Sequence, residues 1–408
     1  MTEKVIEKIL LVTYAAPPAA GGIQNLSYLF DSFPSSKLNV LTSYANMKFS
    51  TGPPLNGDYF FYQNPREASD ESQKEAVEKR KNIFLNFDFL KTIAKIFLFV
   101  RKGIELIRKN NYDVLVAVSD FGPAMVSTYF LSRISGIPFN LILFDIYREN
   151  VPDKVHGLVA RIMEPLLLKA ANKIILTNEG TRDFYKNIYG NKVVEKIVVI
   201  HNSSDPELYA DFIKPFDPKP PYHILFTGYF YWAQEESILN LLKSLQLLNE
   251  NIFFDLYTPK KLDSETKEKL LSIYPKIHFG SAPKEEMPKV QTAADILFLP
   301  LSFGGASHRN LINTATPGKL SDYLIAGRPI LINAPQSSYL ARYAKENDFA
   351  AVVTEGEVIN LGAEIKRLLF DKEFSENLIE NARETFFQNH DMHKSKELFR
   401  SVFIKQKI

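Results

Sequence analysis

Short apolar runs alternate with amphipathic stretches along the whole chain. In the first half, β-branched apolar runs predict buried strands at 8–13, 38–42, 114–118, 139–144, 173–177 and 196–200. Helical periodicity predicts helices at 23–30, 79–109, 124–135, 158–170 and 182–189, and the polar stretch 46–72 predicts a loop. Strands that alternate with helices favour a parallel sheet with right-handed crossovers.

A second alternation of the same kind begins after a proline-rich stretch. Its predicted strands are 224–227, 252–257, 277–279, 296–299, 330–333 and 351–354. A chain of 408 residues suits two hydrophobic cores better than one. We therefore predict an α/β protein with Rossmann-like domains at 1–205 and 222–388, a linker at 206–221, and a C-terminal helix within 389–408 that crosses back to the first domain.

The composition narrows the class of protein. A hydrophobic content of 45%, a charged content of 24% and a net charge of +2 are typical of a soluble globular protein with no overall attraction to nucleic acid. Cysteine is absent, which excludes disulfides, thiolate zinc sites and a cysteine nucleophile. The first residues, MTEKVIEKILLV, carry acidic residues and a strand pattern, and no apolar run approaches 18 residues. We expect a cytoplasmic protein without a signal peptide or a membrane span.

The sequence TPGKLSDYLIAGRPILI, which begins at Thr316, has the pattern of a helix that binds an anion. Thr316 is a natural N-cap for a helix over 317–326. A diphosphate at its start would meet free N–H groups, a close approach at Gly318 and the ammonium of Lys319. Asp322, one turn further on, could accept hydrogen bonds from ribose hydroxyls. The alternative is an ordinary capped amphipathic helix with a solvated lysine.

This stretch resembles the signature of GT-B glycosyltransferases of the large retaining family, glycosyltransferase family 4-like or group 1. In that family a Pro-Ser-Lys-Leu type turn, an acidic residue and Ala-x-Gly-x-Pro lie in one run. The segment 163–190 and the turn IHNSSD at 200–205 resemble the same family. The resemblance implies two Rossmann-like domains that face each other across a cleft. It also implies transfer of a sugar from a nucleotide diphosphate donor, bound mainly by the second domain, to an acceptor hydroxyl bound by the first.

The candidate site residues follow from glycine loops, strand ends and this resemblance. The donor-binding candidates are Gly21, Gly22, Gly228, Gly280, Ser281, Arg309, Thr314, Thr316, Gly318, Lys319 and Asp322. The acceptor-side candidates are Tyr147 and Asn202, and the catalytic candidates are Asp145, Asp120 and Lys319. Asp145 and Asp120 follow predicted strands, at the edge where open α/β sheets bind ligands, although each could equally cap a helix. There is no D-x-D run, so we expect neither a metal nor another cofactor.

Several polar groups of the family pattern are replaced here. The first glutamate of its paired acids falls on Thr314, its arginine and lysine fall near Tyr229 and Gln234, and its histidine falls near Phe144. We expect a retaining, metal-independent transferase. The replacements leave open a catalytically degenerate protein that binds a nucleotide sugar and regulates another glycosyltransferase. A nucleotide-sugar epimerase of the same fold is a third reading, but we can assign no paired acid and base for it.

The segment 79–109 interleaves lysine and arginine with phenylalanine. A basic helix with an aromatic face is attracted to anionic membrane surfaces, so one prediction is peripheral contact with the inner face of a membrane. The other is a helix that faces the core with a solvated basic side. Together with the habit of the family, this segment suggests a glycan or lipid-linked acceptor from polysaccharide biosynthesis.

Overall fold

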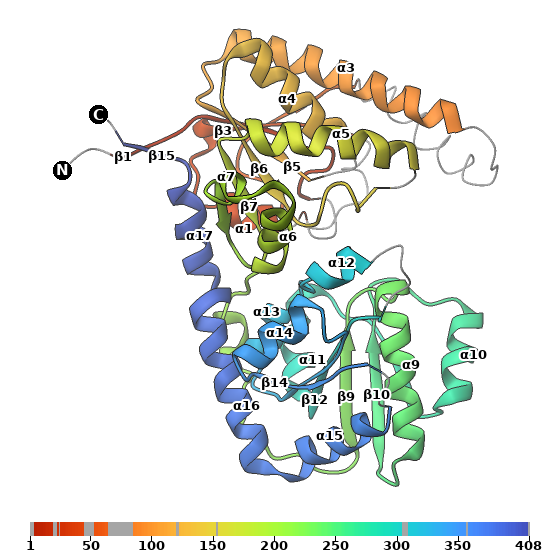
Figure 1. The fold of residues 1–408 in the computed structure, drawn as a ribbon. Coiled ribbons are helices and arrows are strands. Elements are labelled where there is room, and N and C mark those ends of the chain that lie inside the picture. Colours follow the sequence, from red (N-terminus) through yellow and green to blue (C-terminus); the bar gives the residue numbers. More distant parts are fainter. Residues whose placement is uncertain are drawn as a thin grey trace. The chain divides into compact units, whose positions relative to one another are not determined.

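The structure is a computed structural model that describes residues 4–18, 23, 25–44, 53–63, 85–119, 122–151, 154–303, 309–355 and 358–406. The chain forms two compact units, each with its own sheet (Figure 1). Unit 1 consists of Met1–Ile200 together with Ser395–Ile408, and unit 2 consists of His201–Lys394. The predicted boundary at 205 therefore lies five residues beyond the observed end of the first stretch of unit 1.

Unit 1 contains a seven-stranded parallel sheet in the order β4-β3-β2-β5-β6-β7-β8. Its strands are β2 (Ile9–Val12), β3 (Leu38–Thr42), β4 (Asp58–Phe61), β5 (Val114–Val118), β6 (Phe139–Leu143), β7 (Lys173–Leu176) and β8 (Ile197–Val199). Six of them confirm predicted strands. The loop predicted at 46–72 was wrong over β4, because the short sequence DYFF forms a partly exposed edge strand without the buried apolar run of a central strand.

The helices of unit 1 are α1 (Asn25–Phe30), α3 (Leu85–Lys109), α4 (Pro123–Ser135), α5 (Lys154–Ala170), α6 (Glu179–Tyr189) and α7 (Asn191–Val194), with a 3-10 turn at Ser35–Lys37. Local chemistry sets their ends. The side chain of Asn178 accepts a hydrogen bond of 2.8 Å from the N–H of Thr181 and starts α6. Gly136, with a φ of 75°, ends α4 in the left-handed conformation.

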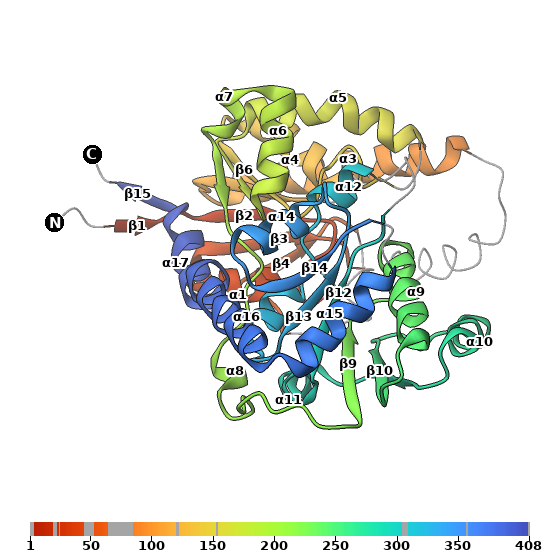
Figure 2. The same cartoon turned by 60° about the horizontal axis from the view of Figure 1, so that its bottom comes forward.

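The C-terminal residues complete unit 1. The strands β1 (Lys4–Ile6) and β15 (Ile404–Gln406) form an antiparallel pair that Figures 1 and 2 show side by side and that we did not predict. Helix α17 (Met392–Ser401) brings Phe399 against Phe30 at a centroid distance of 4.9 Å. Phe403 lies 5.6 Å from Phe33 in the same way. The four buried rings join the C-terminal segment to α1 and to the turn that follows it.

Unit 2 contains a six-stranded parallel sheet in the order β11-β10-β9-β12-β13-β14. Its strands are β9 (Tyr222–Thr227), β10 (Ile252–Tyr257), β11 (Ile277–Gly280), β12 (Ile296–Pro300), β13 (Ile330–Asn333) and β14 (Ala350–Val353). All six confirm predicted strands. Because the central strands are buried on both faces, they are almost continuously apolar and easy to recognise in a sequence.

The helices of unit 2 enclose a hydrophobic core on each face of this sheet. They are α8 (Glu207–Ala210), α9 (Trp232–Leu247), α10 (Ser264–Ile273), α11 (Met287–Ala293), α12 (Arg309–Thr314), α13 (Leu320–Ile325), α14 (Tyr339–Glu346), α15 (Val358–Phe370) and α16 (Lys372–Thr385), with a 3-10 turn at Lys284–Glu286 and a π-helical turn at Phe386–His390. Helices α9, α10 and α15 supply side chains to one core, whereas α13 and α14 supply the other.

The segment 206–221, which we expected to be a linker, is packed onto unit 2. Tyr209 of α8 is 2% exposed and belongs to a core of that unit. The guanidinium of Arg328 donates a hydrogen bond of 2.9 Å to the carbonyl of Lys214. The segment therefore holds fixed contacts with unit 2.

The aromatic cluster predicts a measurable dependence of unit 1 on the C-terminal helix. Phe399→Ala should lower the free energy of unfolding by about 3–5 kcal/mol, because it removes a fully buried ring and leaves a cavity. Urea denaturation of the two proteins measures the change. Leu398→Ala is the control, since Leu398 is the residue directly before Phe399 and is exposed. Equal midpoints for both variants would show that the cluster contributes little.

Candidate functional site

The segment between α12 and α13 corrects the predicted anion-binding helix. Helix α13 begins only at Leu320, and Lys319 occupies its N-cap position without a capping hydrogen bond from its side chain. Thr316 is not the N-cap: among the described residues its buried hydroxyl has no hydrogen-bond partner. The reason is a turn, because the N–H of Leu320 bonds back to the carbonyl of Pro317 at 2.9 Å. The helix predicted over 317–326 is therefore a helix of six residues that starts three positions later.

Lys319 lies against the loop that follows the first strand of unit 2. Its ammonium lies 3.7 Å from the centre of the ring of Phe226, a cation–π contact. Gly228 has a φ of 123°, and a Cβ atom there would lie 2.9 Å from the Nζ atom of Lys319. Only glycine leaves room for this contact and adopts this backbone without strain. Two donor-binding candidates far apart in the sequence are thus neighbours at the carboxyl end of β9.

The surroundings of Lys319 shift the pKa of its side chain. Burial lowers the pKa of the ammonium to about 7, and the nearby carboxylate of Asp322 offsets part of this decrease. A lysine that is partly neutral near pH 7 gains charge when an anion arrives. Perturbed groups of this kind are concentrated at functional sites.

Asp322 is held by other side chains of unit 2. Its carboxylate accepts a short hydrogen bond from the hydroxyl of Ser204, which also bonds to the hydroxyl of Ser321 at 2.9 Å. Burial raises the pKa of Asp322, and the hydrogen bond from Ser204 opposes this increase. The carboxylate is therefore positioned one helical turn from Lys319. Its proposed contact with ribose hydroxyls remains a prediction.

The turn at 200–205 belongs mainly to unit 2. We expected Asn202 on the acceptor side, but it lies within His201–Lys394. Its carbonyl oxygen lies 2.7 Å from the Nδ1 atom of His390, and the Nε2 atom of that ring lies 3.1 Å from the hydroxyl of Tyr343. These contacts fix the turn that carries Ser204. They therefore help to hold Ser204 in position for its hydrogen bond to Asp322.

The loop after β11 is close to an aromatic ring. A Cβ atom at Gly280 would lie 2.6 Å from the ring of Tyr257, which leaves space for that ring only because residue 280 is glycine. The N–H of Thr258 donates a hydrogen bond of 2.9 Å to the carbonyl of Gly280. Ser281 is exposed directly after the strand. An exposed loop beside an aromatic ring is a suitable place for a nucleotide base, and the assignment of Gly280 and Ser281 to donor binding remains a prediction.

The remaining donor-side candidates differ in their availability. Arg309 is exposed at the start of α12, and Gly318 is exposed with open space at its Cα atom. Thr314 is buried, and its hydroxyl donates to the carbonyl of Asn310 at 2.9 Å inside the helix. Its side chain is therefore engaged in the helix. We missed Phe226 and Ser204 as contributors, since a phenylalanine in a strand and a serine in a turn are common in any core or loop.

Only some of the candidates predicted in the first domain lie among the described residues. The donor-binding candidates Gly21 and Gly22 and the catalytic candidate Asp120 lie outside them. Asp145 follows β6, is exposed, and accepts a hydrogen bond of 3.0 Å from the amide of Asn150. Tyr147 is 2% exposed, so its ring is part of the core of unit 1. Among the candidates of unit 1 that the structure describes, Asp145 is the one that is exposed as a residue. Desolvation of its carboxyl group raises the pKa of Asp145, and the hydrogen bond from Asn150 opposes this increase.

Unit 1 also holds a buried acid that the sequence did not reveal. Glu164 of α5 is 1% exposed and accepts hydrogen bonds from the hydroxyl of Tyr189 at 2.7 Å and from the N–H of Arg148 at 3.0 Å. Burial raises the pKa of this carboxyl, and these hydrogen bonds oppose the increase. Because the loop after β6 contains Arg148, the acid helps to fix the segment that carries Asp145.

Comparison with known proteins gives the fold. No protein-family model matches the chain, and no curated protein is similar to it in sequence. Solved structures do match over almost the whole length. Anabaena HepE in complex with UDP is 15% identical with a TM-score of 0.65, and the match covers 97% of this chain and 99% of HepE. Sucrose-phosphate synthase from Thermosynechococcus elongatus is 14% identical with a TM-score of 0.65, covering 97% and 98%.

WaaG, a glycosyltransferase involved in lipopolysaccharide biosynthesis, is 14% identical with a TM-score of 0.62, and the match covers 97% of this chain and 99% of WaaG. These proteins are GT-B glycosyltransferases. The two parallel sheets of seven and six strands are the sheets of that fold. The predicted fold class is confirmed: this chain is a divergent protein with the GT-B fold.

Proposed function

We propose that this protein transfers a sugar from a nucleoside diphosphate donor to a hydroxyl group of an acceptor. The observation that carries the proposal is the position of the Lys319 ammonium, in contact with Gly228 at the carboxyl end of β9. Ligands of open α/β sheets bind at that edge. HepE, which has the same fold, was solved in complexes with UDP and with UDP-glucose. A uridine diphosphate sugar is therefore the first donor to test.

The proposed chemistry depends on the charge that develops as the nucleotide leaves. Departure of the diphosphate places negative charge on its oxygens, and a nearby ammonium lowers the energy of that state. Lys319 is placed for this task, and Arg309 is a second cation in the same unit. With Thr314 in place of an acid, we assign no carboxylate nucleophile. We propose transfer without a metal ion, and retention of configuration rests on the family resemblance alone.

Asp145 is the proposed base for the acceptor hydroxyl. It is exposed at the carboxyl end of β6, where a bound hydroxyl can approach it. The amide of Asn150 donates a hydrogen bond to Oδ2 of Asp145 and does not contact Oδ1. This hydrogen bond fixes the direction of the carboxylate. The acceptor class that we propose is a glycan or a lipid-linked sugar of polysaccharide biosynthesis, and the likeness to WaaG supports it.

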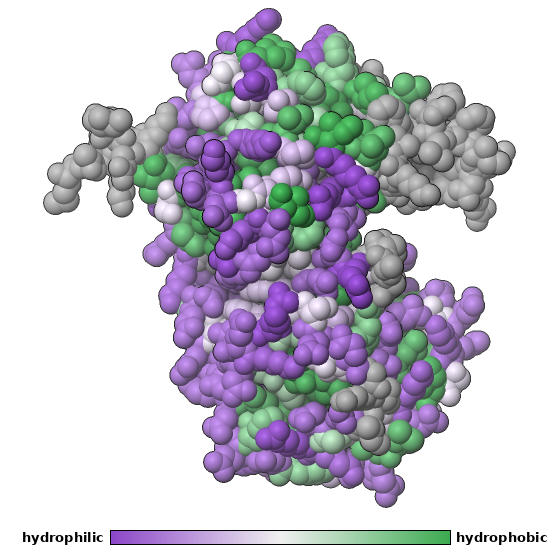
Figure 3. All heavy atoms as spheres, viewed as in Figure 1, coloured by the Kyte–Doolittle hydropathy of each residue, from purple (hydrophilic) through white to green (hydrophobic). Residues whose placement is uncertain are grey.

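The helices α3, α4 and α5 expose a surface suited to a membrane. They pack beside one another in unit 1. Their exposed apolar side chains are Leu90, Ile93, Phe97, Phe130, Ile134, Leu158, Ile162 and Leu166. Exposed arginine and lysine accompany them at Arg101, Arg108, Lys109, Arg133, Arg161 and Lys169. We call these residues the α3–α5 surface, and Figure 3 shows hydrophobic residues gathered over these helices.

A surface that is both apolar and basic fits the headgroup region of an anionic bilayer. None of the described helices combines the length and the apolar composition that a membrane span requires. We therefore propose peripheral attachment to the cytoplasmic face of a membrane, where a lipid-linked acceptor would be within reach.

The alternative is a protein that binds the donor without transferring it, as a partner or regulator of another glycosyltransferase. The replacement of the family acid by Thr314 motivates it. Donor binding is common to both proposals, whereas a rate that depends on Asp145 belongs only to the enzyme.

The first prediction concerns the donor. Lys319→Ala should weaken binding of UDP-glucose about 10–100-fold, the usual effect of losing a charge-assisted hydrogen bond. Lys345→Ala, an exposed lysine of α14, should bind as the unchanged protein does. Because the protonated amine binds the diphosphate and its pKa in the free protein is about 7, affinity should fall about tenfold from pH 6 to pH 8. In Lys319→Ala this dependence should disappear.

Isothermal titration calorimetry in two buffers of different ionisation enthalpy measures both the affinity and the uptake of a proton at pH 7.5. UDP-glucose is preferred to UDP here because its diphosphate keeps one charge state over this pH range. Binding that is independent of Lys319 would overturn the donor assignment. Binding that depends on Lys319 without any transfer or hydrolysis would favour the regulator.

The second prediction concerns the acceptor hydroxyl. Asp145→Asn should lower the transfer rate by about 10²–10⁴-fold, the range for loss of a general base, and leave the affinity for the donor unchanged. Asp183→Asn, an exposed aspartate of α6 in the same unit, should keep the full rate. Release of UDP in the presence of candidate acceptors measures the rate. An unchanged rate in Asp145→Asn would remove this residue from the mechanism.

The third prediction concerns the membrane. Flotation with vesicles of phosphatidylglycerol and phosphatidylcholine should recover the protein, and Phe97→Asp with Leu158→Asp should abolish the recovery, because both side chains are exposed on the α3–α5 surface. Leu247→Asp, an equally exposed leucine of α9 in unit 2, should float normally. Equal recovery of all three proteins would disprove attachment through these helices.

A further inference from the structure

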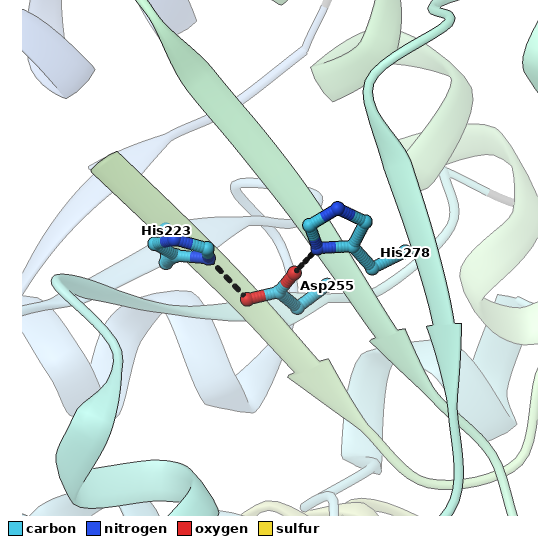
Figure 4. A group of neighbouring side chains, drawn as sticks. All are labelled: His223, Asp255 and His278. Carbon is cyan, nitrogen blue, oxygen red and sulfur yellow. Dashed lines mark hydrogen bonds and ion pairs between the residues drawn. The ribbon is translucent and has the colours of Figure 1, made fainter. Parts of the chain in front are cut away.

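A histidine, an aspartate and a second histidine meet on three neighbouring strands of unit 2. His223 comes from β9, Asp255 from β10 and His278 from β11 (Figure 4). One carboxylate oxygen of Asp255 lies 2.8 Å from the Nδ1 atom of His223, and the other lies 2.9 Å from the Nδ1 atom of His278. One potential ligand atom from each residue lies within 4.8 Å of the other two. Nothing in the proposed sugar transfer uses this group.

The strands hold the three side chains in place. Asp255 is in register with His278, and Phe253, two residues before Asp255, is in register with His223. Because side chains alternate along a strand, all three project from the same face of the sheet. The carboxylate of Asp295 accepts a hydrogen bond of 2.7 Å from the N–H of His223 and fixes the start of β9. The geometry is therefore set by rigid strands and does not depend on a loop.

Solvent can reach the group. The side chain of Asp255 is 15% exposed, that of His223 33% and that of His278 55%. The more buried carboxylate lies between two imidazoles, and the open side is that of His278. An ion could enter from this side and keep a water molecule as a further ligand.

We propose that His223, Asp255 and His278 form a binding site for Zn²⁺. Two imidazole nitrogens and one carboxylate oxygen are a common set of zinc ligands, at distances of about 2.0–2.2 Å. Tetrahedral ligands at these distances lie about 3.3 Å from one another. The two nitrogens now lie 2.8 and 2.9 Å from different oxygens of the carboxylate, and one ligand atom from each residue lies within 4.8 Å of the others, so rotation of the side chains would have to adjust these distances to admit the ion. On binding, each neutral imidazole would change tautomer and carry its proton on Nε2, so that Nδ1 can bind zinc in place of its hydrogen bond to Asp255.

The position of the site separates it from the donor. His223 is the second residue of β9, whereas Gly228 follows the end of that strand. Five residues of extended chain span about 16 Å. The ring of Tyr257 and the adjacent Gly280 lie on the carboxyl side of the group. The ion would therefore join β9, β10 and β11 as a structural clamp, and it would not touch the diphosphate.

The ammonium of Lys276 is near the proposed zinc site and would repel the ion, but it points toward Asn251. The ammonium of Lys276 lies 6.0 Å from the centre of the ring of Phe253, the residue in register with His223. It donates a hydrogen bond of 3.0 Å to the side chain of Asn251, which turns it toward the preceding loop. Phe253 itself stacks on both imidazoles, at 5.6 Å from His223 and 4.5 Å from His278, and holds the planes of the rings.

The experiment is a titration of the metal-free full-length protein with Zn²⁺ alone at pH 7.5, followed by calorimetry and by thermal unfolding. We expect one ion per chain and a rise in Tm of about 5–10 °C at a hundredfold excess over Kd. His278→Ala should weaken binding at least tenfold, and as an exposed side chain it should leave the fold intact. His393→Ala, an exposed histidine outside the group, should bind zinc as the unchanged protein does.

Cobalt gives a second readout that does not depend on stability. Co²⁺ bound by two histidines and an aspartate should show visible absorption bands that are lost in Asp255→Asn and kept in His393→Ala. Failure of the unchanged protein to bind Zn²⁺, or equal binding by His278→Ala, would overturn the proposal and leave Asp255 as a hydrogen-bond acceptor for two imidazoles. Lys319→Ala should bind zinc normally and His278→Ala should bind UDP-glucose normally, so this result is independent of the proposed transferase.

Discussion

The close approach of Lys319 to the backbone at Gly228 is the constraint on which the candidate site depends. A long cationic side chain lies over an aromatic ring and fills the space where any other residue at 228 would place its Cβ atom. Burial of an ammonium without a directly bonded carboxylate costs free energy, and the lowered pKa of Lys319 expresses that cost. Under the proposed function, a bound anion would offset this cost.

Asp322, one helical turn from Lys319, differs because its carboxylate has a hydrogen-bond partner. Asp322 is satisfied by the hydroxyl of Ser204, which the chain supplies where it enters unit 2. The same turn is fixed through Asn202 and His390, at the π-helical turn after α16. Hydrogen bonds from Tyr209 and Gln291 also lower the pKa of Asp322, so several partners hold its carboxylate in one direction. In the proposed donor site, Lys319 would change its charge when the ligand binds, whereas Asp322 has fixed partners before binding.

The fold could be predicted because the strands that build both sheets are buried on both faces, so their apolar runs stand out. We did not predict the strands β4 and β1. β4 is a partly exposed edge strand, and β1 pairs with β15, which is near the other end of the sequence. The start of α13 was misplaced because Thr316 and Pro317 fit the cap pattern while the backbone forms a turn there. The histidines of the zinc site are separated by whole helices, and only the strand order brings them together.

The return of the C-terminal residues to unit 1 has a consequence for synthesis of the protein. The ribosome makes the residues before 200 first, but Phe399 and Phe403, which cover Phe30 and Phe33, emerge only after the whole of unit 2. Until then the rings of the first helix have no aromatic partners from the C-terminal helix, and an exposed apolar cluster invites aggregation. Unit 1 can therefore complete this packing only after Ser395–Ile408 has been synthesised, whereas all of unit 2 has been made before then.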